Sequence, residues 1–239
     1  MEILKVENIS KEYPDFRLEK VSFSVKKGTI MGFIGRNGAG KTTVLKSIMN
    51  MVHTSEGRIL FWDTDIKENE NIIKQRIGFA AGAVDYYKKK SIRSILDITK
   101  TFYKNWDESL CQKYLKLFSI DENKSPSELS EGMKVKFNLT LALSHNAELL
   151  ILDEPTSGLD PISRDELLEI FSYLKSQGVS ILFSTHITSD LDKCADDITY
   201  IKDGRIVYTG SAEEFSKGEK IEDIILKHEK EAFYEKLAL

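Results

Sequence analysis

Short apolar or alternating runs recur along the chain and are separated by polar residues and glycines. They predict strands at residues 3–9, 21–25, 29–34, 58–61, 148–152, 180–184, 198–201 and 205–209. The middle of the chain instead has apolar residues at helical spacing, over residues 91–104, 109–118 and 132–144. Together these patterns predict a mostly parallel α/β core into which a helical lobe is inserted.

A further helix is predicted after Pro161. Ser163 and Glu166 have the spacing of a capping box, and Gly178 can end the helix after an apolar stripe at positions 167, 170, 171 and 174. The predicted strand at 180–184 follows directly. This segment therefore has the helix-to-strand order of a doubly wound fold.

The most informative motif lies between the predicted strand at 29–34 and an amphipathic segment at 43–49. It matches G-x-x-x-x-G-K-[ST] and consists of Gly35, Arg36, Asn37, Gly38, Ala39, Gly40, Lys41, Thr42 and Thr43. Glycines let backbone N–H groups surround a phosphate chain, and the N-terminus of the next helix favours the same anion. Lys41 would contact the β- and γ-phosphates, and the Thr42 hydroxyl would bind Mg²⁺. An ordinary glycine-rich turn is the alternative, but the lysine, the hydroxyl and both flanking elements favour a triphosphate site.

A second candidate feature follows the apolar strand at 148–152, which ends in Asp153 and Glu154. Open α/β sheets place ligands at the carboxyl ends of their strands. Asp153 would hold Mg²⁺, directly or through water, and Glu154 would orient and deprotonate a water that attacks the γ-phosphate. An acidic pair by itself is usually a solvated strand end, but the phosphate loop favours the catalytic interpretation.

Composition excludes several other classes of protein. The 239 residues carry a net charge of -4, so no general basic field suggests a nucleic-acid partner. No run approaches the roughly 18 apolar residues of a membrane span, and the first residues lack the pattern of a signal peptide. We therefore expect a cytoplasmic protein in which Cys111 and Cys194, which lack metal-site spacing, are ordinary thiols.

A third motif, Leu-Ser-Glu-Gly-Met at 129–133, precedes the acidic pair by about twenty residues. It resembles Leu-Ser-Gly-Gly-Gln, the signature of the nucleotide-binding subunits of ATP-binding cassette (ABC) transporters, and matches it at Ser130 and Gly132 but not at Glu131 and Met133. Ser130 is also a good N-cap for the helix that follows, and a plain capped helix start is the alternative. The resemblance implies that Ser130 and Gly132 contact the nucleotide of a second chain.

The resemblance continues at Asp160 and His186. Residues 157–160 are similar to the D-loop of the family, in which Asp160 would help to connect the two nucleotide sites. His186 follows the predicted strand at 180–184 and is similar to the switch histidine, which would contact the γ-phosphate and hold the water and Glu154 in register. The three other histidines, at positions 53, 145 and 228, are expected to be ordinary surface residues.

Tyr13 occupies the place of the aromatic residue that stacks on adenine in this family. A phenol ring offers a flat apolar face to a base. An exposed loop tyrosine with no ligand is the alternative.

One element of the family is missing. A glutamine that reaches Mg²⁺ and contacts the membrane subunit usually follows the strand that contains residues 77–79, but here residues 80–85 contain Gly82 and Asp85 and no glutamine. Asp85 could replace it, or the loop could couple through its backbone. The aromatic and basic residues at 86–90 follow, in the region where the family docks its membrane subunit. They could meet a cytoplasmic helix of that partner or form a solvated loop.

The resemblance extends over residues 2–217. It implies a P-loop NTPase core with a mostly parallel sheet, an N-terminal antiparallel β portion and an inserted α-helical subdomain at about 86–146. Residues 1–217 would form this ABC ATPase domain, and residues 218–239 would form a C-terminal helical tail whose apolar residues pack on the same domain.

The implied function is that of an ATP-hydrolysing subunit that uses ATP and Mg²⁺. As a homodimer or heterodimer it would drive a separate transmembrane permease, at the inner face of the cell membrane, and similarity over 141–148 suggests the exporter branch called ABC-2 type. The alternatives are a soluble ABC ATPase of DNA repair, translation or cofactor assembly, and a regulatory cassette with weak turnover. The cargo is not encoded in such a subunit.

Overall fold

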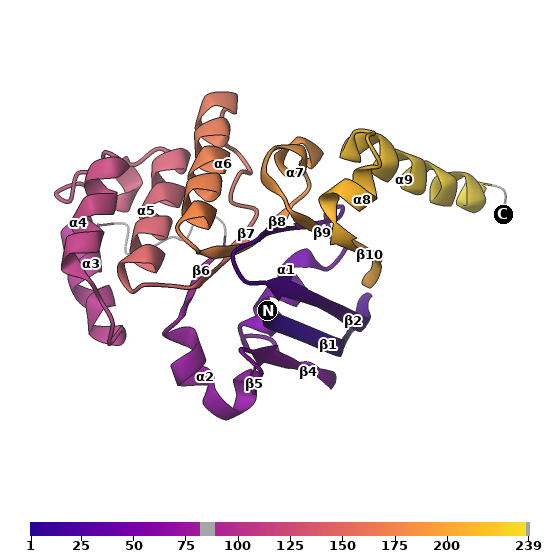
Figure 1. Cartoon of the computed structure of the whole chain (residues 1–239), viewed down its shortest axis with the longest axis horizontal. Coiled ribbons are helices and arrows are strands. Elements are labelled where there is room, and N and C mark those ends of the chain that lie inside the picture. Colours follow the sequence, from indigo (N-terminus) through magenta and orange to yellow (C-terminus); the bar gives the residue numbers. More distant parts are fainter. Residues whose placement is uncertain (82–88, 238–239) are drawn as a thin grey trace.

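The computed structural model describes residues 1–81 and 89–237, which form two β-sheets and the helices packed on them (Figure 1). The larger sheet has six strands in the order β10-β9-β3-β8-β7-β6. These are β3 (Ile30–Ile34), β6 (Ile77–Ala81), β7 (Leu149–Asp153), β8 (Ser180–Thr185), β9 (Asp197–Lys202) and β10 (Arg205–Ser211). All neighbours in this sheet are parallel except β10, which pairs antiparallel with β9.

The smaller sheet is antiparallel and has the order β2-β1-β4-β5. Its strands are β1 (Glu2–Tyr13), β2 (Phe16–Lys26), β4 (Glu56–Phe61) and β5 (Thr64–Asp65). This sheet lies below the six-stranded sheet in Figure 1. The mostly parallel core and the N-terminal antiparallel portion that the sequence predicts are both confirmed.

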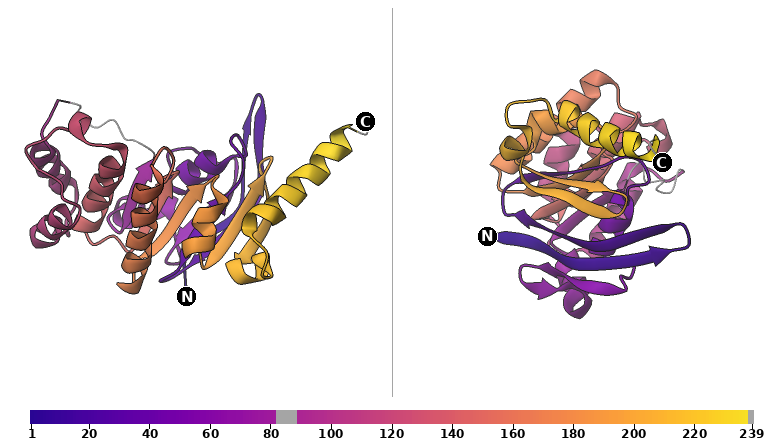
Figure 2. Two further views of the ribbon diagram at one scale, coloured as in Figure 1. Left: turned by 90° about the horizontal axis from the view of Figure 1, so that it is seen from above. Right: turned by 90° about the vertical axis from the view of Figure 1, so that its right-hand side faces the viewer.

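Helices follow the strands in the order expected of an α/β chain. They are α1 (Lys41–Ile48), α2 (Ile66–Lys74), α3 (Ile92–Thr99), α4 (Glu108–Leu117), α5 (Glu131–Ser144), α6 (Pro161–Ser176), α7 (Thr188–Cys194), α8 (Ala212–Ser216) and α9 (Ile221–Leu237), with short 3-10 helices η1 (Lys100–Phe102) and η2 (Pro126–Glu128). The helices α3 to α5 lie between β6 and β7 in the chain and occupy one end of the molecule (Figures 1 and 2). The predicted helical insertion is therefore present.

The central sheet separates two hydrophobic cores, and side-chain alternation along its strands explains why both are filled. On β3, Met31 and Phe33 join the core shared with the antiparallel sheet and α1, whereas Ile30 and Ile34 join the core shared with the helices. A strand buried on both faces must be apolar along its length, which is the pattern of β3 and of the first four residues of β7. Full burial of each such side chain contributes about 1.5–3 kcal/mol.

Two local predictions are wrong. The cap of α6 is Asp160 rather than Ser163, because Pro161 occupies the first helical position and the Asp160 carboxylate accepts hydrogen bonds from the N–H groups of Ile162 and Ser163. His145, expected at the surface, is 2% exposed. Its ring stacks on Tyr103 with the centroids 3.8 Å apart.

The tail that the sequence predicts as a helix is α9. Ile221 is buried, and Ile224 and Ile225 pack against the core on the helical side of the sheet, as expected for a helix that packs on its own domain. The second half of α9 extends away from the body in Figure 2. Across the described ranges, no helix has both the length and the apolar character needed to cross a bilayer.

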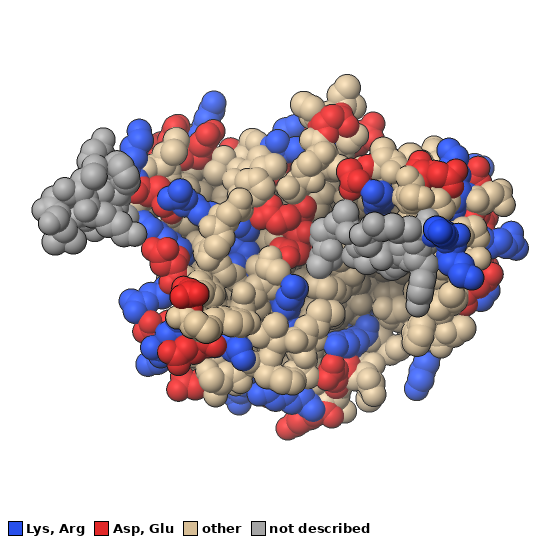
Figure 3. Space-filling view, turned by 180° about the vertical axis from the view of Figure 1, so that it is seen from behind, with Lys and Arg blue, Asp and Glu red and all other residues tan. Residues whose placement is uncertain are grey.

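Acidic and basic side chains are interspersed over the face shown in Figure 3. On this face, outside the grey atoms, there is no continuous basic band of the kind that follows a phosphate backbone.

Candidate functional site

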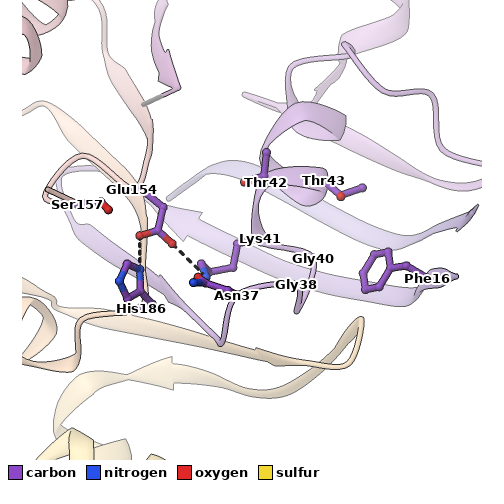
Figure 4. A pocket seen from close by; sticks show the side chains of 10 residues that line it. All are labelled: Phe16, Asn37, Gly38, Gly40, Lys41, Thr42, Thr43, Glu154, Ser157 and His186. Atoms are coloured by element: carbon purple, nitrogen blue, oxygen red, sulfur yellow. Dashed lines mark hydrogen bonds and ion pairs between the residues drawn. The ribbon is translucent and has the colours of Figure 1, made fainter. Parts of the chain in front are cut away.

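Three adjacent parallel strands carry the candidate residues to one edge of the central sheet. β8 pairs with β3 on one side and β7 on the other, so the loops after all three strands leave the sheet at the same edge. A pocket of about 370 Å³ lies there. It is lined by Phe16, Asn37, Gly38, Gly40, Lys41, Thr42, Thr43, Glu154, Ser157 and His186 (Figure 4).

The loop between β3 and α1 depends on glycine at position 40. Gly40 has φ +107°, and a Cβ atom there would lie 2.7 Å from both the Phe16 ring and the Leu18 side chain. Gly40 is also the N-cap of α1 and has no side chain to bond the first amides of the helix. Those N–H groups and the positive end of the helix dipole are therefore available to an anion.

Lys41 is 5% exposed, and its ammonium is held over this loop. Nζ donates to the carbonyl oxygens of Gly35 at 2.7 Å and Arg36 at 3.3 Å, and it forms an ion pair with Glu154 Oε1 at 3.1 Å. An ammonium has three donors, and these three acceptors account for them. A phosphate that binds here must displace at least one of them.

Glu154 connects Lys41 to His186. Its backbone has φ 52°, a left-handed conformation that is uncommon for residues other than glycine, at a sharp turn directly after β7. Its N–H donates to Ser184 Oγ at 2.9 Å, and its Oε2 lies 2.6 Å from His186 Nδ1. Figure 4 shows Lys41 and His186 on either side of the Glu154 carboxylate.

Asp153, the residue before Glu154, contacts different side chains. Asp153 Oδ2 accepts a hydrogen bond from Thr42 Oγ1 at 2.7 Å, and its Oδ1 accepts one from Ser184 Oγ at 2.6 Å. A hydroxyl and a carboxylate are oxygen ligands of the kind that Mg²⁺ prefers. Within residues 1–81 and 89–237 there is no group of three or more His, Cys, Asp or Glu side chains that could hold a metal by themselves. A magnesium ion at Thr42 and Asp153 would therefore take its other ligands from phosphate and water.

The other predicted loop residues have clear positions. Asn37, Gly38 and Thr43 line the pocket, and Ala39 is buried behind it. The Arg36 side chain is exposed and forms an ion pair with Glu229 of α9 at 3.4 Å.

Three predicted site residues do not line this pocket, because they lie at the N-termini of α5 and α6. Ser130 caps α5, where its hydroxyl accepts from the N–H of Met133 at 3.3 Å, as the sequence predicts. Gly132 lies in the first turn of the same helix. Asp160 caps α6, and the hydrogen bond from the Ser163 hydroxyl lowers the pKa of its carboxyl below the ordinary value.

The aromatic residue at the pocket is Phe16 and not Tyr13. Tyr13 is 39% exposed, and its ring centroid lies 6.5 Å from that of Phe16. Sequence reasoning missed Phe16, although a second aromatic residue three positions after Tyr13, at the start of the next strand, was a usable signal. It also gave no role to Ser157, which lines the pocket from the loop after β7. The predicted glutamine replacement at 82–85 and the aromatic residues at 86–87 lie outside the described residues.

Comparisons with a family model, with curated proteins and with solved structures agree with the resemblance seen in the sequence motifs. Residues 18–157 match a family model described as ABC transporter. SrtF of Streptococcus pyogenes, a lantibiotic transport ATP-binding protein, is 31% identical over 224 residues, which cover 93% of this chain and 95% of SrtF. YtrB of Bacillus subtilis, an ABC transporter ATP-binding protein, is 31% identical over 190 residues, which cover 79% of this chain but only 65% of YtrB. The solved structure of an ATP binding subunit of an ABC transporter has a TM-score of 0.84 and 25% identity and covers 94% of this chain and 98% of its own.

Proposed function

Because the chain belongs to the ABC transporter family, we propose that it is the ATP-binding and ATP-hydrolysing subunit of a membrane transporter. The observation that carries this proposal is the contact of Glu154 with both Lys41 and His186 inside one pocket. A carboxylate at the end of a strand that only faces solvent would not require contacts with both a buried lysine and a histidine.

In the proposed reaction the loop amides and Lys41 hold the phosphates of ATP. A water attacks the γ-phosphorus, the bond from that phosphorus to the β–γ bridging oxygen breaks, and ADP and phosphate leave. Glu154 accepts the proton of the water, and His186 holds the Glu154 carboxylate in place through Nδ1. Mg²⁺ bound by Thr42 and Asp153 would neutralise charge on the phosphate oxygens.

We propose Phe16 as the main aromatic contact of the adenine, with Tyr13 next to it. Phe16 lies at the end of the pocket opposite His186 in Figure 4, with the phosphate loop between them. A base stacked there would leave its triphosphate directed toward Lys41. Aromatic stacking of this kind contributes about 1–3 kcal/mol per base.

The proposed active unit contains two cassettes, either two copies of this chain or this chain and a homologue. Ser130 and Gly132 are far along the chain from the phosphate loop and do not line its pocket. Hydroxyl and helix-start N–H groups suit a phosphate, and a second chain would bring them to this one. ATP would then favour the closed dimer, and hydrolysis would favour its opening.

The proposed partner is a separate transmembrane permease, with this chain bound to it at the cytoplasmic face of the membrane. The name of SrtF as a lantibiotic transport protein supports transport, and its 31% identity over nearly the whole of both chains supports a shared architecture. We propose export as the direction. A soluble ABC ATPase and a regulatory cassette are the rival functions.

Affinity purification from solubilised membranes tests this proposal. The Glu154→Gln variant in Mg·ATP should retain a polytopic membrane protein, and the Lys41→Ala variant, with the phosphate contact removed, should retain less of it if closure strengthens the complex. Recovery of nucleic acid or soluble enzymes alone would support the soluble rival and contradict the transporter assignment.

A further inference from the structure

Asp190 is a fully buried carboxylate in α7, four residues after His186. It does not line the pocket. Its Oδ2 accepts hydrogen bonds from Thr156 Oγ1 at 2.6 Å and from Thr185 Oγ1 at 3.3 Å. Its Oδ1 accepts one from Arg164 Nε at 2.5 Å. One side chain therefore joins three segments that are separate in the sequence.

Two of these segments adjoin residues that line the pocket. Thr156 lies between Glu154 and Ser157 in the loop after β7. Thr185 is the last residue of β8 and precedes His186. The third partner, Arg164, lies in the first turn of α6, which Asp160 caps.

The contacts continue into the backbone of the His186 loop. The N–H of Ile187 donates to Thr185 Oγ1 at 2.9 Å, and that hydroxyl donates to Asp190. Arg164 also donates from Nη2 to Ser189 Oγ. The residues on both sides of His186 are therefore tied to the same carboxylate, while His186 itself is 40% exposed and reaches Glu154.

Burial makes this arrangement rigid. A carboxylate that is removed from water is tolerated only when its oxygens are paired, so Asp190 keeps its partners at fixed distances. Charge-assisted hydrogen bonds of this length have narrow geometry. Through Thr156 and Thr185, Asp190 connects the loop that carries Glu154 to the strand end that precedes His186. His186 Nδ1 lies 2.6 Å from Glu154 Oε2.

We propose that Asp190 is a positioning residue that holds Glu154 and His186 in register for attack by water, through Thr156 and Thr185. This inference rests on the proposed ATPase function of the site. It assigns to α7 a role in the rate of hydrolysis, although no side chain of the network meets the nucleotide pocket. Nucleotide affinity, which depends on Lys41 and the phosphate loop, is left unchanged.

The test compares Asp190→Asn, which keeps the shape but removes the charge, with Thr156→Val, which removes one donor and leaves the Arg164 pair intact. Glu148→Gln is the matched control, because Glu148 also pairs with an arginine, Arg76, at 2.6 and 2.9 Å but at the opposite end of β7. Single-turnover hydrolysis and binding of a non-hydrolysable ATP analogue are measured for each folded variant, in the wild-type and the His186→Ala backgrounds.

We expect Asp190→Asn to lower the single-turnover rate by about 10- to 100-fold, the size of effect that misplacement of reacting groups produces, with analogue affinity within about 3-fold of the wild type. Thr156→Val should have a smaller effect in the same direction, and Glu148→Gln none. In the His186→Ala background, Asp190→Asn should add little, because both changes act through one contact.

An unchanged rate in folded Asp190→Asn would overturn the proposal, as would a full additional loss in the His186→Ala background. If Asp190→Asn does not fold, Thr156→Val decides by the same criteria. A wild-type chain that binds the analogue but shows no hydrolysis would instead contradict the proposed function itself.

Discussion

The ion pair between Lys41 and Glu154 predicts that Glu154→Gln binds nucleotide more tightly than the wild type. Lys41 Nζ lies 3.1 Å from Glu154 Oε1, and the two side chains are only 5% and 22% exposed. A phosphate that binds Lys41 must weaken this pair and also lies close to the negative carboxylate. Glutamine keeps the shape of Glu154 and removes the charge.

The expected size follows from the partial burial of the pair. Hydrogen bonds to charged groups contribute about 1.5–3 kcal/mol and exposed ion pairs about 0–1 kcal/mol, so this pair, to which water has partial access, contributes about 1–2 kcal/mol. Release of that energy corresponds to an affinity gain of about 5- to 30-fold. In a Lys41→Met background most of the gain should disappear, because the lysine that the substitution releases is absent.

Titration calorimetry with a non-hydrolysable ATP analogue measures this affinity without interference from turnover. Glu148→Gln is the control, because its pairing with Arg76 lies outside the pocket. Equal or weaker binding by Glu154→Gln would show that Lys41 need not be released from Glu154 before it meets the phosphates.

Three further predictions concern other parts of the chain. Gly40→Ala should lower the free energy of unfolding by about 2–4 kcal/mol, because Gly40 has φ +107° and the new Cβ would lie 2.7 Å from the Phe16 ring. Chemical denaturation measures this loss, and an unchanged free energy of unfolding would contradict the loop geometry. Phe16→Ala should weaken analogue binding by about 1–3 kcal/mol, more than Tyr13→Ala, and the reverse order would favour Tyr13 as the stacking residue. Burial lowers the pKa of His145 from 6.5 to about 4, so between these pH values the unfolded chain binds more protons than the folded chain. About 3 kcal/mol of the free energy of unfolding that is present above pH 6.5 should therefore be lost as the pH falls to about 4. A His145→Phe variant, which cannot titrate, should lack that share of the loss, and an identical pH profile would refute the assignment.

The parts of the site that could be predicted from sequence are those encoded by neighbouring residues. The phosphate loop needs glycine, lysine and threonine at fixed spacing between a strand and a helix, so Lys41 and Thr42 were identifiable at once. Glu154 follows an apolar strand, and parallel strands deliver their ends to one edge of a sheet. The parallel core was predictable for the same reason, since strands buried on both faces are continuously apolar.

The parts that could not be predicted depend on contacts between distant segments. His145 is buried because Tyr103 stacks on it and the Gln75 carbonyl accepts a hydrogen bond from Nδ1 at 3.2 Å, and neither partner is near it in the sequence. The role of Asp190 likewise depends on Thr156 and Arg164. The cap of α6 was mistaken because Ser163 fits a local pattern that Asp160, followed by Pro161, satisfies better.

We infer that this pocket hydrolyses ATP with Glu154 as the base, and the decisive measurement is single-turnover hydrolysis by the purified wild-type chain and by Glu154→Gln. The loss of a general base lowers a rate by about 10²- to 10⁴-fold, so we predict a fall of that size with nucleotide binding retained or strengthened. Equal rates for the two proteins, measured with the same Mg·ATP, would contradict the claim.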